Sequence, residues 1–409
     1  MKIYQVGGCV RDKLLGIPIK DQDWVVVGAS LSQMLDLGYK QVGKNFPVFL
    51  HPDTQDEYAL ARTEIKTAPG YTGFEFSAPP TVTLEEDLLR RDLTINAIAK
   101  SDDGELIDPY DGQTDLKNHI LRHVSPAFAE DPVRILRIAR FAARFFTLNF
   151  TIADETMQLM TSMVAAGEVD SLVEERVWQE LHASLGESHP EVFFAVLREC
   201  GALARLFPEI ENLYGVPQPE RYHPEIDTGV HTMMVLQQAC LLSQDTKVRF
   251  AALVHDLGKG ITPKDELPKH ISHETRGVPL VKALCKRFKV PNAYQDLAVK
   301  VTQYHLHYHR IAELKASTIL KTLSALNAFR QADNFELFIL ACEADARGRT
   351  GYEDKLPPQS EQFRMAFMAA NEVDITSITS ANISGKEIGA QIQKTRLSAI
   401  KNCIKIFKP

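Results

Sequence analysis

The stretch VGGCVRDKLLGIPIKDQDWVVVG, residues 6–28, combines a glycine pair, a helix start bearing Arg11, and two aspartates at the head of an apolar run. Within a strand, residues two apart face the same side, so Asp21 and Asp23 are expected to project side by side. Their like charges repel unless a cation lies between them. An isolated pair of this kind at a strand entrance is usually just solvated. The neighbouring residues therefore have to indicate whether this pair has a function.

The glycine pair, Arg11 and the aspartates fall within 17 residues, from Gly7 to Asp23. Glycines let the backbone approach a phosphate closely, and a helix N-terminus offers free N–H groups and a positive dipole end. Two carboxylates on one face can hold Mg²⁺ ions, which activate an attacking hydroxyl and steady a leaving pyrophosphate. The combination predicts phosphoryl or nucleotidyl transfer.

The composition predicts a globular protein of the cytoplasm. A chain of 409 residues predicts two to four domains. Its 44% hydrophobic and 24% charged residues are an ordinary balance, with no apolar run long enough to span a membrane and no signal-peptide pattern at the start. Six cysteines, scattered singly, predict a reducing compartment without disulfides or a zinc knuckle. The net charge of −7 disfavours only indiscriminate binding to nucleic acid, because binding to phosphate depends on local basic patches.

The predicted secondary structure changes near residue 116. Before it, strands are expected at 2–6, 23–28 and 57–63, a helix from 10, and a helix or strand at 93–100. After it, helical periodicity predicts helices at 129–146, 171–186, 190–206, 229–243, 247–258, 277–288, 293–305 and 332–346. Proline-rich joints occur at 214–227 and 351–360, and a helical tail follows the second. The fold class is therefore α+β, an α/β head followed by a helical body.

The segment EDPVRILRIARFAAR, residues 130–144, predicts a helix with two distinct faces. Asp131 and Pro132 suit its first turn. At 100° per residue, the arginines occupy an arc of about 120°, and apolar side chains gather opposite. The cationic face comprises Arg134, Arg137, Arg140 and Arg144, and the packing face Ile135, Ile138, Ala139, Ala142 and Phe145. Without further context, such a cationic face is commonly only solvated.

The pattern G-G-x-x-R-D-x-L-L-G-x-x-x-x-D-x-D-x-V, residues 7–25, resembles the signature of the class II CCA-adding and poly(A) polymerase group of polymerase-beta-like nucleotidyltransferases. The agreement continues through RRDLTINAIA (90–99), IDPYDG (107–112) and the helix at 130–144. The first 350 residues are similar to the bacterial multifunctional members of the group. The resemblance implies a nucleotidyltransferase head (1–115), a helical nucleotide-recognition and neck region (116–220) and an HD phosphohydrolase domain (221–350). A helical basic tail (351–409) follows, and nothing is inferred for it from the resemblance.

The resemblance also implies an activity, the addition and repair of the 3′-terminal CCA of tRNA with CTP and ATP. By this likeness, Asp21 and Asp23 are catalytic and carry Mg²⁺, and Asp131 and Arg134 read the incoming base. A carboxylate accepts from an exocyclic amine and a guanidinium donates to a ring acceptor, a pattern that cytosine and adenine share. The other nucleotide-binding residues implied are Gly8, Arg11, Arg91, Arg137 and Arg140, while Asp92 and Asn96 can bind a ribose or organise their loop.

A second candidate site lies in VRFAALVHDLGKG, residues 248–260, where His255 and Asp256 interrupt an apolar helix. A buried pair of this kind can be a simple core hydrogen bond. Further candidates are spread along the chain: His231 before the pair, His270 and His273 after it, three histidines in YHLHYHR (304–310), and Asp345 in LACEADARGR.

This order of residues resembles the HD phosphohydrolases, in which such ligands hold a transition metal that activates water. The resemblance implies that His255 and Asp256 are catalytic, and that His305 is the ligand from YHLHYHR. It also implies 2′,3′-cyclic phosphodiesterase, 2′-nucleotidase and phosphatase activities. Ligation by imidazole suits Ni²⁺, Co²⁺ or Mn²⁺ better than Mg²⁺. The implied ligands are His231, His255, Asp256, His273, His305 and Asp345.

Three alternatives stay open at this point. The same head occurs in poly(A) polymerases and in enzymes that add only C or only A; the chain could be a tRNA-binding factor without catalysis; or it could be an HD nucleotidase whose head senses nucleotides. The basic tail is either a solvated face or a contact to tRNA phosphates. The protein is expected to be a monomer or homodimer. The basic residues of the tail are Lys386, Lys394, Arg396, Lys401, Lys405 and Lys408, set against Glu387.

Overall fold

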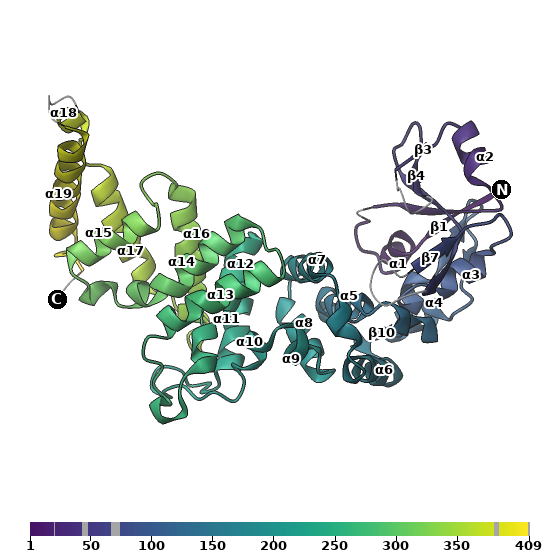
Figure 1. The fold of residues 1–409 in the computed structure, drawn as a ribbon, viewed down its shortest axis with the longest axis horizontal. Helices are drawn as coiled ribbons and strands as arrows, with labels where there is room; N and C mark the ends of the chain where they lie inside the picture. Colours follow the sequence, from purple (N-terminus) through teal and green to yellow (C-terminus); the bar gives the residue numbers. More distant parts are fainter. Residues whose placement is uncertain (20, 43–47, 67–73, 380–383, 408–409) are drawn as a thin grey trace. The chain divides into compact units, whose positions relative to one another are not determined.

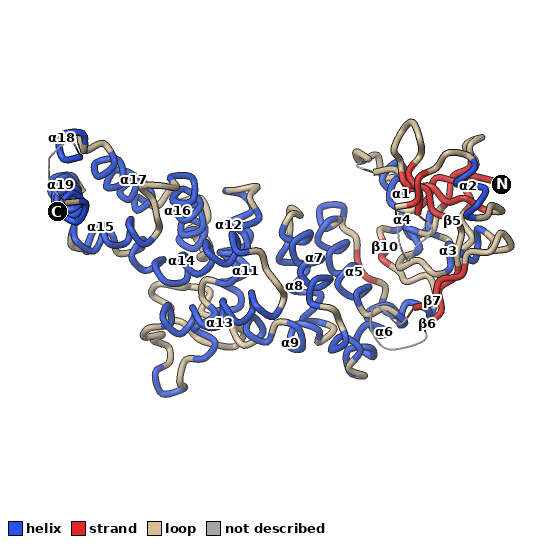
Figure 2. The backbone as a smooth tube through the Cα atoms, turned by 45° about the horizontal axis from the view of Figure 1, so that its top comes forward, coloured by secondary structure: helices blue, strands red, loops and turns tan. Residues whose placement is uncertain are grey.

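The computed structural model describes residues 1–409 except 20, 43–47, 67–73, 380–383 and 408–409. The chain forms two compact units (Figure 1). One comprises Met1–Glu187 with Val192–Leu206, and the other Ser188–Glu191 with Phe207–Pro409. The main sheet belongs to the first unit, and the described part of the second is built from helices and loops (Figure 2). The predicted α+β class is confirmed.

The first unit is organised around one mixed sheet. Its neighbours pair antiparallel except for β2 and β5, which run parallel. A separate antiparallel pair joins β6 (Thr63–Lys66) to β7 (Phe74–Ser77), and a short parallel pair joins β10 (Ile120–Leu121) to β11 (Thr151–Ile152). The order of the main sheet is β3 (Lys40–Gln41), β4 (Val48–Leu50), β5 (Glu57–Leu60), β2 (Asp23–Val27), β1 (Lys2–Val6), β8 (Ala99–Ser101) and β9 (Leu106–Ile107).

The apolar run after the aspartates becomes a central strand because both faces of the sheet are covered. Successive residues of β2 point to opposite faces. Val25 joins a core that includes Leu88 and Ala99, whereas Val26 joins a second core that includes Met34 and Phe49. Asp23 is the first residue of β2, whereas Asp21 precedes the strand. The alternation of side chains within a strand therefore applies to Asp23 and does not determine the direction of the Asp21 side chain.

Helices connect and cover the strands of the first unit. The predicted helix 129–146 is shorter, because a separate 3-10 helix occupies Pro126–Glu130. The predicted helix 190–206 is divided at Gly201, whose φ of 81° belongs to the left-handed region. The helices up to Leu206 are α1 (Gly8–Leu14), α2 (Leu31–Asp36), α3 (Leu84–Leu89), α4 (Gly112–Asn118), α5 (Val133–Arg144), α6 (Asp154–Ala165), α7 (Glu174–Leu185), α8 (Pro190–Glu199) and α9 (Ala202–Leu206).

The second unit is a helical assembly in which α11, α12, α14 and α16 pack together. The proline-rich segment 214–227 belongs to this unit and is followed directly by α11. The four-part domain division stays a prediction. The helices are α10 (Pro208–Glu211), α11 (Thr228–Leu242), α12 (Thr246–Val254), α13 (His273–Arg287), α14 (Asn292–His309), α15 (Ala316–Ala325), α16 (Ala332–Arg347), α17 (Pro358–Asn371), α18 (Thr376–Thr379) and α19 (Gly385–Cys403).

Helix α19 carries most of the basic tail and packs on α15 and α17. Lys386, Lys394, Lys401 and Lys405 are exposed, whereas Arg396 is half-buried with its guanidinium 3.7 Å from the centre of the Phe329 ring. Lys408 lies outside the described residues. All six cysteines are buried free thiols. Among the described helices, none is both long and apolar enough to cross a bilayer.

Candidate active sites

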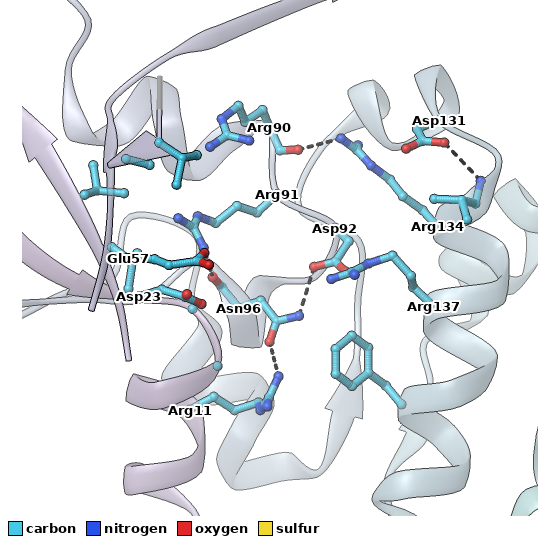
Figure 3. A pocket seen from close by; sticks show the side chains of 18 of the residues that line it. Arg11, Asp23, Glu57, Arg90, Arg91, Asp92, Asn96, Asp131, Arg134 and Arg137 are labelled. Carbon is cyan, nitrogen blue, oxygen red and sulfur yellow. Dashed lines mark hydrogen bonds and ion pairs between the residues drawn. The ribbon is translucent and has the colours of Figure 1, made fainter. Parts of the chain in front are cut away.

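A cavity of about 580 Å³ opens in the first unit. Its wall combines carboxylates from the sheet with arginines from the loop at 90–92 and from α5 (Figure 3). Arg176 of α7 also lines it. Asp21 is exposed and is not part of this wall. The predicted residues that line the cavity are Gly8, Arg11, Asp23, Arg91, Asp131, Arg134, Arg137 and Arg140.

The acidic part of the wall contains Asp23 and Glu57, which lie next to each other (Figure 3). Each is the first residue of its strand, and the parallel register places Asp23 opposite Glu57. Desolvation raises the pKa of Asp23, and the neighbouring charge of Asp21 adds to this rise, while Arg91 opposes it. Carboxylate oxygens are the ligands that Mg²⁺ prefers. Asp21, Asp23 and Glu57 therefore fit a magnesium site by their chemistry.

The turn before α1 requires glycine at position 7. Gly7 has a φ of 72°, and a Cβ there would lie 2.8 Å from Nη1 of Arg91. Arg91 Nη2 is 3.2 Å from Oδ2 of Asp87, which is fully buried, and Nη1 donates to the carbonyl of Asn96 at 3.4 Å. The turn therefore brings the backbone of Gly7 and Gly8 against an anchored guanidinium.

Arg11 is buried, and side chains from several elements hold its guanidinium. Its guanidinium lies 5.1 Å from the ring centres of both Phe141 and Phe145, and it donates to the side chains of Asp12 and Asn96. Cation–π contacts and hydrogen bonds hold a guanidinium in one orientation. Arg11 is thus positioned jointly by Asp12 of its own helix, by Asn96 and by the two aromatic rings at α5.

The arginine face of α5 is paired and is not simply solvated. Arg137 donates to Asp92 at 2.7 Å and Arg140 to Glu180 of α7 at 2.6 Å. Burial acts to raise the pKa of Asp92, but Arg137 and a hydrogen bond from Asn96 outweigh it and hold that pKa well below its usual range. Arg144 donates to Asp12 at 2.8 Å. The face thus joins the head to α7 while still lining the cavity.

Asp131 and Arg134, the pair expected to read the base, are both anchored. Arg176 of α7 donates to both carboxylate oxygens of Asp131, at 3.0 and 2.8 Å. Arg134 donates to the carbonyl of Ala127 at 2.8 Å and to the carbonyl of Arg90 at 2.7 Å (Figure 3). No local pattern predicts Glu57, Arg176 or Glu180, because these residues reach their partners by strand register or from a helix remote in sequence. Asp12 lies next to Arg11 in the quoted pattern, but its contacts to Arg11 and Arg144 were not predicted.

The second unit brings all six predicted HD ligands together from four helices and the loop after α12. His231 comes from α11, His273 from α13, His305 from α14 and Asp345 from α16. Two groups of three have ligand atoms within 4.8 Å of one another. One is His231, His255 and Asp345; the other is Asp256, His273 and His305.

Each of these four histidines has its Nδ1 against a backbone carbonyl. The distances are 2.9 Å for His231 to Gly348, 2.7 Å for His255 to Ala252, 2.8 Å for His273 to His270 and 3.0 Å for His305 to Thr302. Because a carbonyl only accepts hydrogen bonds, each Nδ1 donates, and a neutral ring then presents the lone pair of Nε2. This tautomer is the one that Nε2 metal ligation needs.

The electrostatics of the cluster favour a cation. Burial acts to lower the pKa of His255, but the carboxylates of Asp256 and Asp345 outweigh it and raise the value to about 10. Nε2 of His255 and Oδ1 of Asp256 are buried without a hydrogen-bond partner among the described residues. Unpaired buried donors and acceptors are costly, and a divalent metal ion would satisfy both atoms. The residues present therefore fit a metal.

A cavity of about 590 Å³ gives access to this cluster. Lys259 also lines it, with Nζ 2.6 Å from both Oδ2 of Asp256 and Oε1 of Gln218. His270 contacts Thr262 and the carbonyl of Pro217 and lies outside the two groups of ligands. His309 is 2.6 Å from Oδ2 of Asp345, a contact that the sequence analysis did not identify.

The loop after Asp256 packs so closely on α13 that residue 258 must be glycine. A Cβ at Gly258 would collide with the carbonyl oxygen of His273 and lie 2.7 Å from the amide nitrogen of Gly277. We therefore expect Gly258→Ala to lower the free energy of unfolding by about 1–3 kcal/mol and to weaken Ni²⁺ binding.

Urea denaturation and Ni²⁺ titration calorimetry measure these two effects. The matched control is Gly389→Ala in α19, where a Cβ meets open space; there the change to alanine should stabilise by roughly 0.5–1 kcal/mol. Equal stability of the Gly258→Ala variant and the unmodified protein would contradict the packing described here.

Comparison with known proteins finds three family matches along the chain. Residues 3–122 match the poly A polymerase head domain, 149–214 the family described as "Probable RNA and SrmB- binding site of polymerase A", and 228–346 the HD domain. The chain is 62% identical over 401 residues to the "Multifunctional CCA protein" of Thioalkalivibrio sulfidiphilus (strain HL-EbGR7), covering 98% of each chain.

Two solved structures share the fold. A CCA-adding enzyme in complex with ATP has a TM-score of 0.66 at 21% identity, over 98% of this chain and 88% of that chain. The Thermotoga maritima CCA-adding enzyme complexed with tRNA has a TM-score of 0.63 at 20% identity, over 100% of this chain and 92% of that chain. At these identities the likeness concerns the fold alone.

Proposed function

Because the chain belongs to the family of the multifunctional CCA proteins, we propose that it adds and repairs the 3′-terminal CCA of tRNA and hydrolyses phosphate esters at its HD centre. The observation that carries the proposal is the presence of two separate sites of different chemistry in one chain. One cavity combines carboxylates with arginines, and the other contains buried imidazoles. Nucleotidyl transfer and metal-assisted hydrolysis need these two environments.

In the head, the residues act by holding and orienting the nucleotide. Mg²⁺ bound by Asp21 and Asp23 would supply activation of the tRNA 3′-hydroxyl and stabilisation of the leaving pyrophosphate. Arg11, Arg91 and Arg140 bind the triphosphate, and their anchoring on neighbouring residues keeps them in place before it arrives. Fixed charges of this kind stabilise a transition state without reorganisation at the moment of reaction.

Choice of nucleotide falls to Asp131 and Arg134. Asp131 accepts from the exocyclic amine of cytosine or adenine, and Arg134 donates to the adjacent ring acceptor. The bidentate contact of Arg176 fixes the Asp131 carboxylate, and two carbonyls fix Arg134. A rigid pair suits selection without a template, because its geometry admits one hydrogen-bonding pattern.

We expect Asp131→Ala and Arg134→Ala to let UTP and GTP compete with CTP and ATP. Each lost group removes roughly 1–3 kcal/mol of discrimination, about a 5- to 150-fold change in the ratio of kcat/KM values. The assay supplies each labelled nucleotide separately to tRNA lacking CCA. Lys117→Ala, an exposed cation of α4 outside the cavity wall, is the control. Equal slowing of all four nucleotides in the variants would assign Asp131 and Arg134 a structural role instead.

At the HD centre, His255 and Asp256 are the central ligands, with Ni²⁺, Co²⁺ or Mn²⁺ as the metal. A metal held there would activate water for attack on phosphorus. The site opens to a cavity of about 590 Å³, and its proposed substrates are phosphate esters: 2′,3′-cyclic phosphates and 2′-phosphates at RNA ends, and phosphomonoesters. We place the protein in the cytoplasm, acting on tRNA as a monomer or homodimer.

A further inference from the structure

The cavity beside the histidine cluster of the second unit contains a buried hydrogen-bond donor that has no partner. Gln218 is 2% exposed and lines this cavity. Its Oε1 accepts from Nζ of Lys259 at 2.6 Å. Because an ammonium group only donates, this contact fixes the orientation of the amide. Nε2 is then left buried, with no hydrogen-bond partner among the described residues, and a ligand with an acceptor oxygen would satisfy it.

The neighbours of Gln218 indicate which acceptor that is. Nζ of Lys259 also lies 2.6 Å from Oδ2 of Asp256, so a single side chain separates Gln218 from the proposed site of hydrolysis. A phosphate ester placed for hydrolysis brings its anionic oxygens to this end of the cavity, where hydrogen bonds to a charged acceptor are strong. The free amide N–H of Gln218 therefore suits a phosphoryl oxygen.

The cavity wall also contains a buried acceptor that a phosphate group does not satisfy. Gln359 of α17 lines the cavity, and its Oε1 is buried without a hydrogen-bond partner in the part of the chain that the structure describes. A phosphate dianion has no hydrogen to donate. A ligand that satisfies Gln359 must therefore carry a hydroxyl, amino or ring N–H group in addition to its phosphate.

An aromatic ring completes the wall. Tyr222 lines the same cavity and is 57% exposed. Its backbone is held at both ends, because its N–H donates to the carbonyl of Pro219 at 3.0 Å and its carbonyl accepts from Nη1 of Arg349 at 3.5 Å. An exposed aromatic ring on a fixed backbone is the kind of surface on which a nucleobase stacks.

We propose that this cavity recognises the nucleoside of a nucleoside 2′-phosphate or 2′,3′-cyclic phosphate: Gln218 donates to a phosphoryl oxygen, Tyr222 stacks on the base, and Gln359 accepts from a donor group of the nucleoside. The inference rests on the proposed phosphohydrolase and names the residues that determine its specificity. The cavity of about 590 Å³ lies within the range of roughly 300–1,000 Å³ that is usual for small-molecule sites. Phosphate esters without a nucleoside are then poor substrates.

Hydrolysis of 2′-AMP and of glycerol 2-phosphate tests this assignment. Both are monoesters of a secondary alcohol, and only 2′-AMP carries a nucleoside. With the full chain and Ni²⁺, we expect the parent protein to prefer 2′-AMP. Tyr222→Ala and Gln359→Leu should each lower the ratio of the two kcat/KM values by about 5- to 150-fold.

Three further variants separate the roles. Gln218→Glu keeps an acceptor for Lys259 but places a carboxylate oxygen where the donor was, so it should raise KM for both esters. Tyr222→Phe keeps the ring and should keep the ratio. Gln362→Leu is the matched control for Gln359→Leu, because Gln362 belongs to the same helix and does not line the cavity; the ratio should not change.

Equal kcat/KM values for the two esters in the parent protein would overturn the proposal. So would an unchanged ratio in both Tyr222→Ala and Gln359→Leu, including the case in which both activities fall equally, since that pattern indicates a structural role. Unchanged KM values in Gln218→Glu would overturn the assignment of Gln218.

The proposed phosphohydrolase can fail separately. If the parent protein hydrolyses neither ester, that function is wrong, and titration calorimetry with 2′-AMP decides the nucleoside site. Weaker binding to Tyr222→Ala than to the parent protein and to Tyr222→Phe would support the site, whereas equal binding to all three would overturn it.

Discussion

Replacing Asp23 by alanine should abolish nucleotide addition while tRNA binding stays close to that of the unmodified protein. Asp23 lines the head cavity beside Glu57, where its carboxylate is placed to hold Mg²⁺. Loss of that ion removes several kcal/mol of transition-state stabilisation, a fall in rate on the order of a thousandfold or more. On the proposal that Asp21 supplies the second carboxylate, Asp21→Ala should have the same effect, although Asp21 lies outside the cavity wall.

Labelled CTP incorporation into tRNA lacking CCA measures this effect, and filter binding at fixed salt measures tRNA affinity. Asp36→Ala removes an equal charge from the exposed end of α2, outside the cavity wall, and should leave both unchanged. Incorporation by Asp23→Ala at nearly the unmodified rate with Mg²⁺ would show that the aspartates do not carry the metal.

His255→Ala and Asp256→Ala should remove phosphohydrolase activity and leave CCA addition intact. The two sites lie in separate compact units and need share no catalytic group. Their ligands also differ, since imidazoles suit Ni²⁺ or Co²⁺ and carboxylates suit Mg²⁺. Removing either residue takes away a buried ligand at the centre of the cluster, so we expect hydrolysis to fall to background.

A pair of assays on each variant tests this separation: p-nitrophenyl phosphate with Ni²⁺, and truncated tRNA with CTP, ATP and Mg²⁺. Joint loss of both activities in a protein that unfolds cooperatively at the normal temperature would contradict two independent sites. Hydrolysis that survives in both variants would show that His255 and Asp256 only form a hydrogen bond in the core.

The sequence predicts most strongly where one local pattern determines the structure. The apolar run at 23–28 becomes a central strand because both sheet faces are covered, and the alternation of arginines with apolar residues produces α5. Helix α15 was not predicted. Its serine, threonine and isoleucine have modest helix propensity, and burial of Ile319 and Leu323 against the rest of the unit determines its structure.

Partners from remote elements could not be predicted. Glu57 reaches Asp23 through strand register, and Arg176 and Glu180 reach α5 from α7. No local pattern marks these contacts. The histidine order in the second unit indicated six ligands, but their division into two sets depends on the orientation of one side chain, Asp256.

Addition of CCA is measured by sequencing the 3′ ends of tRNA lacking CCA after incubation with the protein, CTP, ATP and Mg²⁺. We expect products that end in CCA, two added cytidines with CTP alone, and no addition after one adenosine. Runs of adenosine would contradict this expectation and indicate a poly(A) polymerase. If the ends are not extended although the protein is folded and hydrolyses phosphate esters, the result would instead indicate that the head only senses nucleotides.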